Sequence, residues 1–159
     1  TDAYKKLLKA SDNYLGMDPN PVTRKSILPP SGNKHDYLSL APYAWPDSTK
    51  PNGLPWQPRD GEINPLTRGD NTDQVRLGKL WDALDHLALA LYYSNDKRYA
   101  QKALDLMQVW FVDTAERVNP NINFGQGVPG VNNGRAAGVI EWTGISRAIT
   151  MIQVLEEKV

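Results

Sequence analysis

The sequence predicts an all-α fold built from antiparallel helical hairpins, and three observations support this class. Apolar residues recur at helical spacing over residues 2–15, 72–94, 96–110 and 138–157. Ten of the twelve prolines lie between positions 19 and 65, so the long irregular segment at about residues 19–70 cannot form a long helix. No segment alternates apolar and polar residues convincingly enough to predict a strand.

Local signals place the first helices along the chain. The first helix covers residues 2–15 and is expected to stop at Gly16. The strongest helix begins near Thr72 or Asp73 and ends at residues 94–95, and another follows at once from Asp96. Because so few residues join these two long helices, we expect them to form an antiparallel pair.

The last predicted helix runs over residues 138–157, with Ile145, Ile149 and Ile152 facing inward. These inward residues continue to the end of the chain, as though another element should follow. The segment before this helix, residues 119–134, is rich in Asn and Gly and carries no helical stripe, so we expect a loop there.

Composition bounds the function. The 159 residues favour one domain, and 18 basic against 18 acidic residues argue against nucleic acid or an anionic membrane as partner. Cysteine is absent and only His35 and His86 are present, which excludes disulfide scaffolds, cysteine nucleophiles and histidine-rich metal cages. No run approaches the ~18 apolar residues of a membrane span, and the polar start carries no signal peptide, which leaves localisation open.

Two loop clusters carry polar groups that could do chemistry. Residues 31–47 place a cation, an imidazole, a carboxylate and a phenol beside an aromatic platform. The aromatic rings could stack on a sugar and the Lys-His pair suits an anionic ligand, or the cluster could simply anchor the loop. The aromatic residues argue against disorder of this arm, and we interpret it as an ordered loop packed on a helical body. Residues 119–135 offer Asn, Gln and Arg for hydroxyls and carboxylates, or form an ordinary connector.

Residues 34–47, Lys-His-Asp-Tyr-Leu-Ser-Leu-Ala-Pro-Tyr-Ala-Trp-Pro-Asp, resemble the signature of the alginate lyase family of polysaccharide lyases. Further matches follow in order at residues 53–65, 89–93, 110–111 and 119–135. The resemblance implies an (α/α) toroid, an incomplete barrel of helical hairpins around a cleft. Residues 1–159 are similar to the N-terminal portion of such a domain, so a further partner would be the C-terminal half of the same domain.

The resemblance also implies β-elimination of a uronate-containing polysaccharide, alginate or a related uronan, with no cofactor and no metal, in the periplasm or outside the cell. Two alternatives are a non-catalytic uronan-binding module and a glycoside hydrolase of the same toroid architecture.

In a lyase, a base removes the proton at C5 and an acid protonates the departing O4, roles that suit His and Tyr. We therefore predict His35 and Tyr37 as catalytic residues. Groups that neutralise or hydrogen-bond the substrate carboxylate stabilise the developing charge. The predicted substrate-binding residues are Lys34, Asp36, Tyr43, Trp45, Asn123, Gln126 and Arg135. We expect the arm to present Lys34, His35 and Tyr37 to a cleft shared with Gln126 and Arg135.

Overall fold

The structure is a computed structural model that describes all residues from 1 to 159. The chain divides into two compact units, which we call the helical unit and the loop unit. The helical unit comprises residues 1–21, 78–117 and 143–159, and the loop unit comprises residues 22–77 and 118–142. None of the helices is long and apolar enough to cross a membrane.

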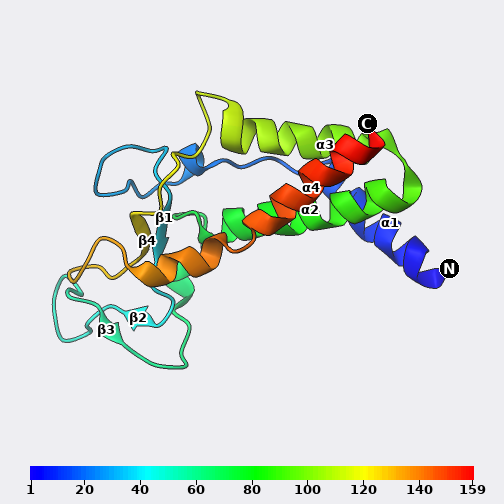
Figure 1. The fold of residues 1–159 in the computed structure, drawn as a ribbon. Coiled ribbons are helices and arrows are strands. Elements are labelled where there is room, and N and C mark those ends of the chain that lie inside the picture. The colour runs from blue at the N-terminus through cyan, green and yellow to red at the C-terminus, as the bar shows by residue number, and fades with distance from the viewer. The chain divides into compact units, whose positions relative to one another are not determined.

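The helical unit contains α1 (Asp2–Leu15), most of α2 (Gln74–Ser94), α3 (Lys97–Met107) and α4 (Ile145–Lys158). One π-helical turn, Gln108–Val112, extends α3. Figure 1 shows α2 and α3 running in opposite directions, as the short connection between them predicted. The structure is helix-rich, which is compatible with the all-α class predicted from the sequence.

The helix ends follow the local signals in the sequence. The Thr1 hydroxyl accepts a hydrogen bond from the amide of Tyr4, and α1 ends at Gly16. The Asp96 carboxylate accepts from the amide of Arg98 and so caps α3, in the manner expected of Asp at an N-cap. Asn95 takes the left-handed conformation, with φ 56°, that lets the chain turn between α2 and α3.

Buried side chains of α3 tie it to α1 and to the segment that follows α1. The hydroxyl of Tyr99 donates to Oδ1 of Asp12 at 2.8 Å, and Nε1 of Trp110 donates to the carbonyl of Pro19 at 2.7 Å. Both rings are almost fully buried, so these bonds satisfy polar atoms that would otherwise be costly to bury. Burial, with the neighbouring carboxylate of Asp12, raises the pKa of Tyr99 to about 12.

The helix predicted over residues 138–157 is wrong in its extent. The first part of this segment is a separate 3₁₀ helix, Ala136–Trp142, and α4 begins only at Ile145. The break falls at Gly144, where an added Cβ would lie 2.3 Å from Cδ1 of Trp81. The isoleucines expected to face inward are also half exposed, with Ile149 at 53% and Ile152 at 47% exposure.

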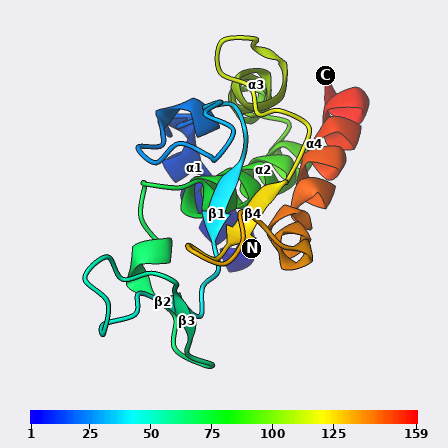
Figure 2. The same cartoon turned by 90° about the vertical axis from the view of Figure 1, so that its left-hand side faces the viewer.

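The loop unit contains four short strands, so the prediction that the chain has none is wrong. Strands β1 (Leu38–Leu40) and β4 (Phe124–Gly127) pair in parallel, and β2 (Ala44–Trp45) and β3 (Gln57–Pro58) pair antiparallel. Figure 2 shows the two pairs as separate ribbons. Strands of two to four residues are too short to show an alternating pattern in the sequence.

The β1–β4 pair contains a bulge. Leu38 pairs with Phe124 and Leu40 pairs with Gly127, so β4 contains one more residue than β1 between these two pairs. The irregularity coincides with Gln126, which has a φ of 50° although it is not glycine. Bulges of this kind re-aim a side chain and are common beside functional sites.

An ion cluster inside the loop unit fastens the proline-rich arm. Nζ of Lys25 lies 3.0 Å from Oδ2 of Asp73, and Nε of Arg76 lies 3.2 Å from the other oxygen of that carboxylate. Lys25 also donates to the carbonyls of Val22 and Lys34. All three charged side chains are at most 1% exposed, so the cluster ties residue 25 of the arm to residues 73–76.

Candidate functional site

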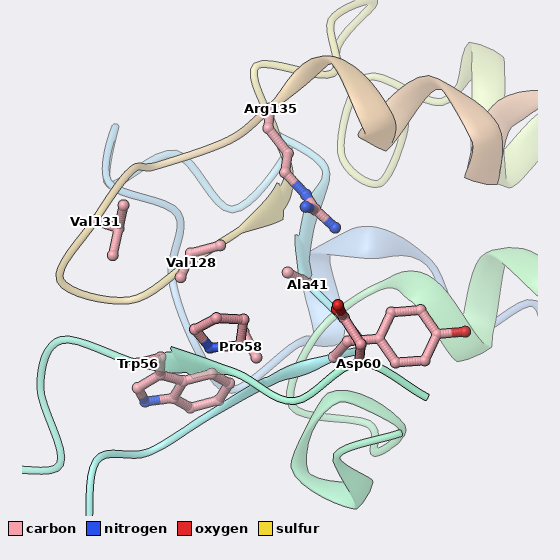
Figure 3. A pocket seen from close by; sticks show the side chains of 9 residues that line it. Ala41, Trp56, Pro58, Asp60, Val128, Val131 and Arg135 are labelled. Carbon is pink, nitrogen blue, oxygen red and sulfur yellow. The ribbon is translucent and has the colours of Figure 1, made fainter. Parts of the chain in front are cut away.

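The loop unit carries a pocket of about 270 Å³ beside the β2–β3 pair. It is lined by Ala41, Tyr43, Ala44, Trp56, Pro58, Asp60, Val128, Val131 and Arg135. Figure 3 shows the guanidinium of Arg135 pointing toward Ala41 and Asp60, with Trp56 and Pro58 on the other side of the space. The pocket therefore combines one cation, one carboxylate and aromatic surface, which can bind a polar ligand through hydrogen bonds and ring contacts.

The side chain of Gln126 binds the guanidinium of Arg135. Oε1 of Gln126 accepts a hydrogen bond from an NH2 group of Arg135 at 2.8 Å. Gln126 itself is only 7% exposed, while Arg135 is exposed. A guanidinium has five N–H donors, so this bond leaves donors of Arg135 for a carboxylate in the pocket.

Backbone hydrogen bonds position the aromatic side of the pocket. The amide of Trp56 donates to the carbonyl of Pro129 at 2.9 Å, and the carbonyl of Tyr43 accepts from the amide of Arg59 at 2.8 Å. Gly130 has a φ of 79°, and a Cβ there would lie 2.8 Å from Cα of Pro55, so the two loops meet backbone to backbone. Residues from three parts of the chain thus surround one space.

Tyr37 does not face this pocket. Its side chain is fully buried, and its hydroxyl donates to Oε2 of Glu141 at 2.7 Å. Burial, and then the negative charge of Glu141, raise the pKa of the phenol well above its usual value. The expectation that the arm presents Tyr37 to an open cleft is therefore wrong, and its catalytic role stays a prediction.

Asp36 clamps two loops together. Its carboxylate accepts hydrogen bonds from the Ser31 hydroxyl at 2.7 Å and from the side-chain amides of Asn119 and Asn121 at 2.7 and 3.0 Å. Burial opposes ionisation, but these three donors outweigh it and hold the pKa of Asp36 below its ordinary value. This carboxylate joins the arm to the Asn-rich loop of the second sequence cluster.

The other predicted site residues lie outside the pocket lining. His35 is half-buried, its amide donates to the side chain of Asn33, and its carbonyl accepts from the amide of Asn119. Lys34 and Asn123 are exposed. Nε1 of Trp45 donates to the carbonyl of Glu62, and the guanidinium of Arg59 lies 4.9 Å from its ring centre.

Of the predicted binding residues, Tyr43 and Arg135 line one pocket and Gln126 supports it. Three residues near the pocket were not predicted from the sequence. Trp56 lines the pocket, the Ser39 hydroxyl accepts a hydrogen bond from the amide of Gln126, and the Glu141 carboxylate accepts one from Ser39. Trp56 belongs to the stretch 53–65 that resembles the family, so that stretch was the available signal. Ser39 likewise lies in the stretch 34–47 that resembles the family, whereas nothing local in the sequence marks Glu141. No three His, Cys, Asp or Glu side chains come together to hold a metal ion.

The fold and pocket describe a helix-rich protein whose loop unit offers one cation and aromatic surface to a ligand. Residues 21–159 match the family described as alginate lyase, and the chain belongs to that family. It is also similar to the crystal structure of an alginate lyase from Bacteroides ovatus, with 42% sequence identity and a TM-score of 0.93. That match covers 98% of this chain but 41% of the Bacteroides chain. None of the curated proteins compared matches this chain.

Proposed function

We propose that the protein is a polysaccharide lyase that cleaves a uronate-containing polysaccharide, alginate or a related uronan, by β-elimination without a cofactor. The supporting observation is the pocket in which Arg135, held by Gln126, lies opposite the ring of Trp56. A guanidinium pairs with the carboxylate of a uronate unit, and an aromatic ring packs against the apolar face of a sugar. Family membership supports the same reaction.

In the proposed reaction, a base removes the C5 proton, the C4–O4 bond breaks, and a double bond forms between C4 and C5. An acid then delivers a proton to O4 of the departing chain. Arg135 would bind a uronate carboxylate and so favour the negative charge that builds up next to C5. His35 and Tyr37 stay the candidates from the sequence for the proton transfers.

The proposed substrate also suggests where the protein works. Uronans are large polymers outside the cytoplasm, so we propose a periplasmic or secreted location. The equal numbers of basic and acidic residues fit a partner bound by one pocket cation rather than by a broad basic surface.

The experiment incubates the full-length protein with alginate, polymannuronate and glucuronan and follows the ultraviolet absorbance of the unsaturated product. The Arg135→Ala variant should lose activity by about 10²-fold, as expected when a group that stabilises developing charge is removed. Arg68→Ala, at an exposed arginine of the same unit outside the pocket, is the control and should keep full activity.

Other outcomes separate the alternatives. New reducing ends without an absorbance rise would indicate a glycoside hydrolase. Binding of a uronan without any cleavage would indicate a non-catalytic binding module. Absence of both binding and cleavage on all three polymers would refute the proposed function.

A further inference from the structure

Gln126, whose side chain accepts a hydrogen bond from Arg135, has an unusual backbone conformation. Its φ of 50° lies in the left-handed region, which is unfavourable for a residue with a Cβ. It also sits at the bulge of the β1–β4 pair, where the regular ladder is interrupted. Something other than the ladder must hold this backbone in place.

The hydroxyl of Ser39 holds it. The amide of Gln126 donates to Oγ of Ser39 at 2.7 Å, and Ser39 is fully buried on β1. Because the hydroxyl accepts here, its own hydrogen is directed elsewhere. That hydrogen goes to Oε2 of Glu141, which lies 2.5 Å from Oγ of Ser39.

A carboxylate accepts hydrogen bonds and donates none, so Glu141 fixes the direction of the Ser39 hydroxyl. Oε2 of Glu141 accepts hydrogen bonds from the hydroxyls of both Ser39 and Tyr37. Hydrogen bonds to a charged acceptor are among the stronger ones in proteins. Because the Ser39 hydroxyl donates its hydrogen bond to Glu141, a lone pair of its oxygen is directed at the Gln126 amide.

The 3₁₀ helix that carries Glu141 reaches this place because two glycines meet. A Cβ on Gly138 would lie 2.8 Å from Cα of Gly125, the residue before Gln126. Any larger residue at either position would keep the helix Ala136–Trp142 away from β4. The sequence thus brings the Glu141 carboxylate within hydrogen-bonding distance of β1.

We propose that Glu141 is a positioning residue that, through the Ser39 hydroxyl and the left-handed backbone of Gln126, sets the place of the Arg135 guanidinium in the pocket. Glu141 and Ser39 do not line the pocket themselves. The path runs from the carboxylate to the hydroxyl, to the Gln126 amide, and from the Gln126 side chain to Arg135. The ligand in this inference, an acidic sugar, rests on the proposed function, whereas the positioning itself does not.

The first experiment tests positioning without any ligand. The side-chain Nε–H signal of Arg135 is followed by NMR relaxation in the full-length protein and in Ser39→Ala, Glu141→Ala and Thr67→Val. Thr67 is the matched control, because it is a buried hydroxyl of the same unit that donates to the carbonyl of Asn64 at 2.7 Å and neither lines the pocket nor bonds to Gln126 or Arg135. Ser39→Ala and Glu141→Ala should increase the mobility of the guanidinium, and Thr67→Val should not. Unchanged Arg135 mobility in Ser39→Ala would overturn the inference.

The second experiment is a double-mutant cycle on the affinity for an oligomer of mannuronate, measured by calorimetry. Ser39→Ala should weaken binding roughly tenfold in the wild-type background. In an Arg135→Ala background it should have almost no further effect, because Ser39 acts on the ligand only through Arg135. Equal weakening in both backgrounds would show a merely structural role and overturn the inference.

The two experiments separate the inference from the proposed function. If the Arg135 guanidinium loosens in Ser39→Ala while the wild-type protein neither binds nor cleaves any uronan, positioning stands and the proposed function fails. If the wild-type protein cleaves a uronan while Arg135 is indifferent to Ser39→Ala, the proposed function stands and positioning fails.

Discussion

A Cβ atom on Gly138 would lie 2.8 Å from the Cα atom of Gly125, so the two backbones touch with no side chain between them. This contact seats the 3₁₀ helix Ala136–Trp142 on β4 inside the loop unit. The carboxylate of Glu141 reaches Ser39 as a result. Two residues without side chains therefore determine where a charged group lies.

We predict that Gly138→Ala destabilises the protein by about 1–3 kcal/mol, the usual cost of forcing extra atoms into a filled space. The neighbouring atoms are backbone and cannot move aside as a flexible side chain would. Urea denaturation followed by circular dichroism measures the change. Gly78→Ala, inside α2 with no atom within 4 Å of the added Cβ, should instead stabilise by up to about 1 kcal/mol. Equal effects of the two substitutions would contradict the contact.

A second prediction concerns the buried cluster of Lys25, Asp73 and Arg76. Lys25→Met removes one of the two cations beside the Asp73 carboxylate and leaves the carbonyls of Val22 and Lys34 without their buried donor, so it should destabilise by about 3–5 kcal/mol. Lys6→Met is the control, since Lys6 pairs with Asp2 at 2.8 Å on the surface and should leave the denaturation midpoint unchanged. If both variants unfold at the same denaturant concentration, the buried cluster contributes no more than a surface pair.

The third prediction is that the pKa values of two carboxyl groups of the loop unit are shifted in opposite directions. Burial raises the pKa of Asp73 to about 6, against the attraction of Lys25 and Arg76. Between pH 3.8 and 6 the folded state then keeps a proton that the unfolded chain has released. The contribution of Asp73 to the free energy of unfolding is therefore fully present below pH 3.8 and is lost as the pH rises to 6.

Asp36 behaves in the opposite way. Although burial opposes its ionisation, hydrogen bonds from Asn119, Ser31 and Asn121 lower its pKa, so its contribution is present above pH 3.8 and is lost as the pH falls through the lowered value. Carboxyl carbon NMR shifts recorded from pH 2 to 8 measure both groups. A single titration near pH 4 for both carboxyls would contradict the two environments.

The sequence predicted best those features that depend on neighbours in the chain. The ends of α1 and α3 follow from Gly16 and from the Asp96 cap, which act within one turn. The break at Gly144 was missed because it depends on Trp81, a residue far away in the sequence. The same reason applies to the parallel pairing of β1 with β4, since their residues are more than 80 positions apart.

The site shows the same division. Tyr43 and Arg135 were predicted from residue types suited to a uronate, and the structure places both in one pocket. Tyr37 was predicted from its type as well, but its burial against Glu141 depends on how residues 136–142 fold back. Residue types therefore indicated two side chains that share a pocket, whereas the burial of Tyr37 could be learned only from the tertiary structure.

The last prediction concerns which tryptophan binds the ligand: Trp56, which lines the pocket, or Trp45, which was predicted from the sequence. Trp56 lines the pocket, whereas the Nε1 of Trp45 is engaged by the carbonyl of Glu62 and its ring by Arg59. If sugars stack in the pocket, Trp56→Ala should weaken binding of a mannuronate oligomer by about tenfold, and Trp45→Ala should weaken it less. Calorimetry on both variants, with circular dichroism to confirm folding, makes the comparison. A larger loss of affinity in Trp45→Ala, with the fold unchanged by circular dichroism, would contradict the prediction and favour the sequence-based assignment of Trp45 to the binding site.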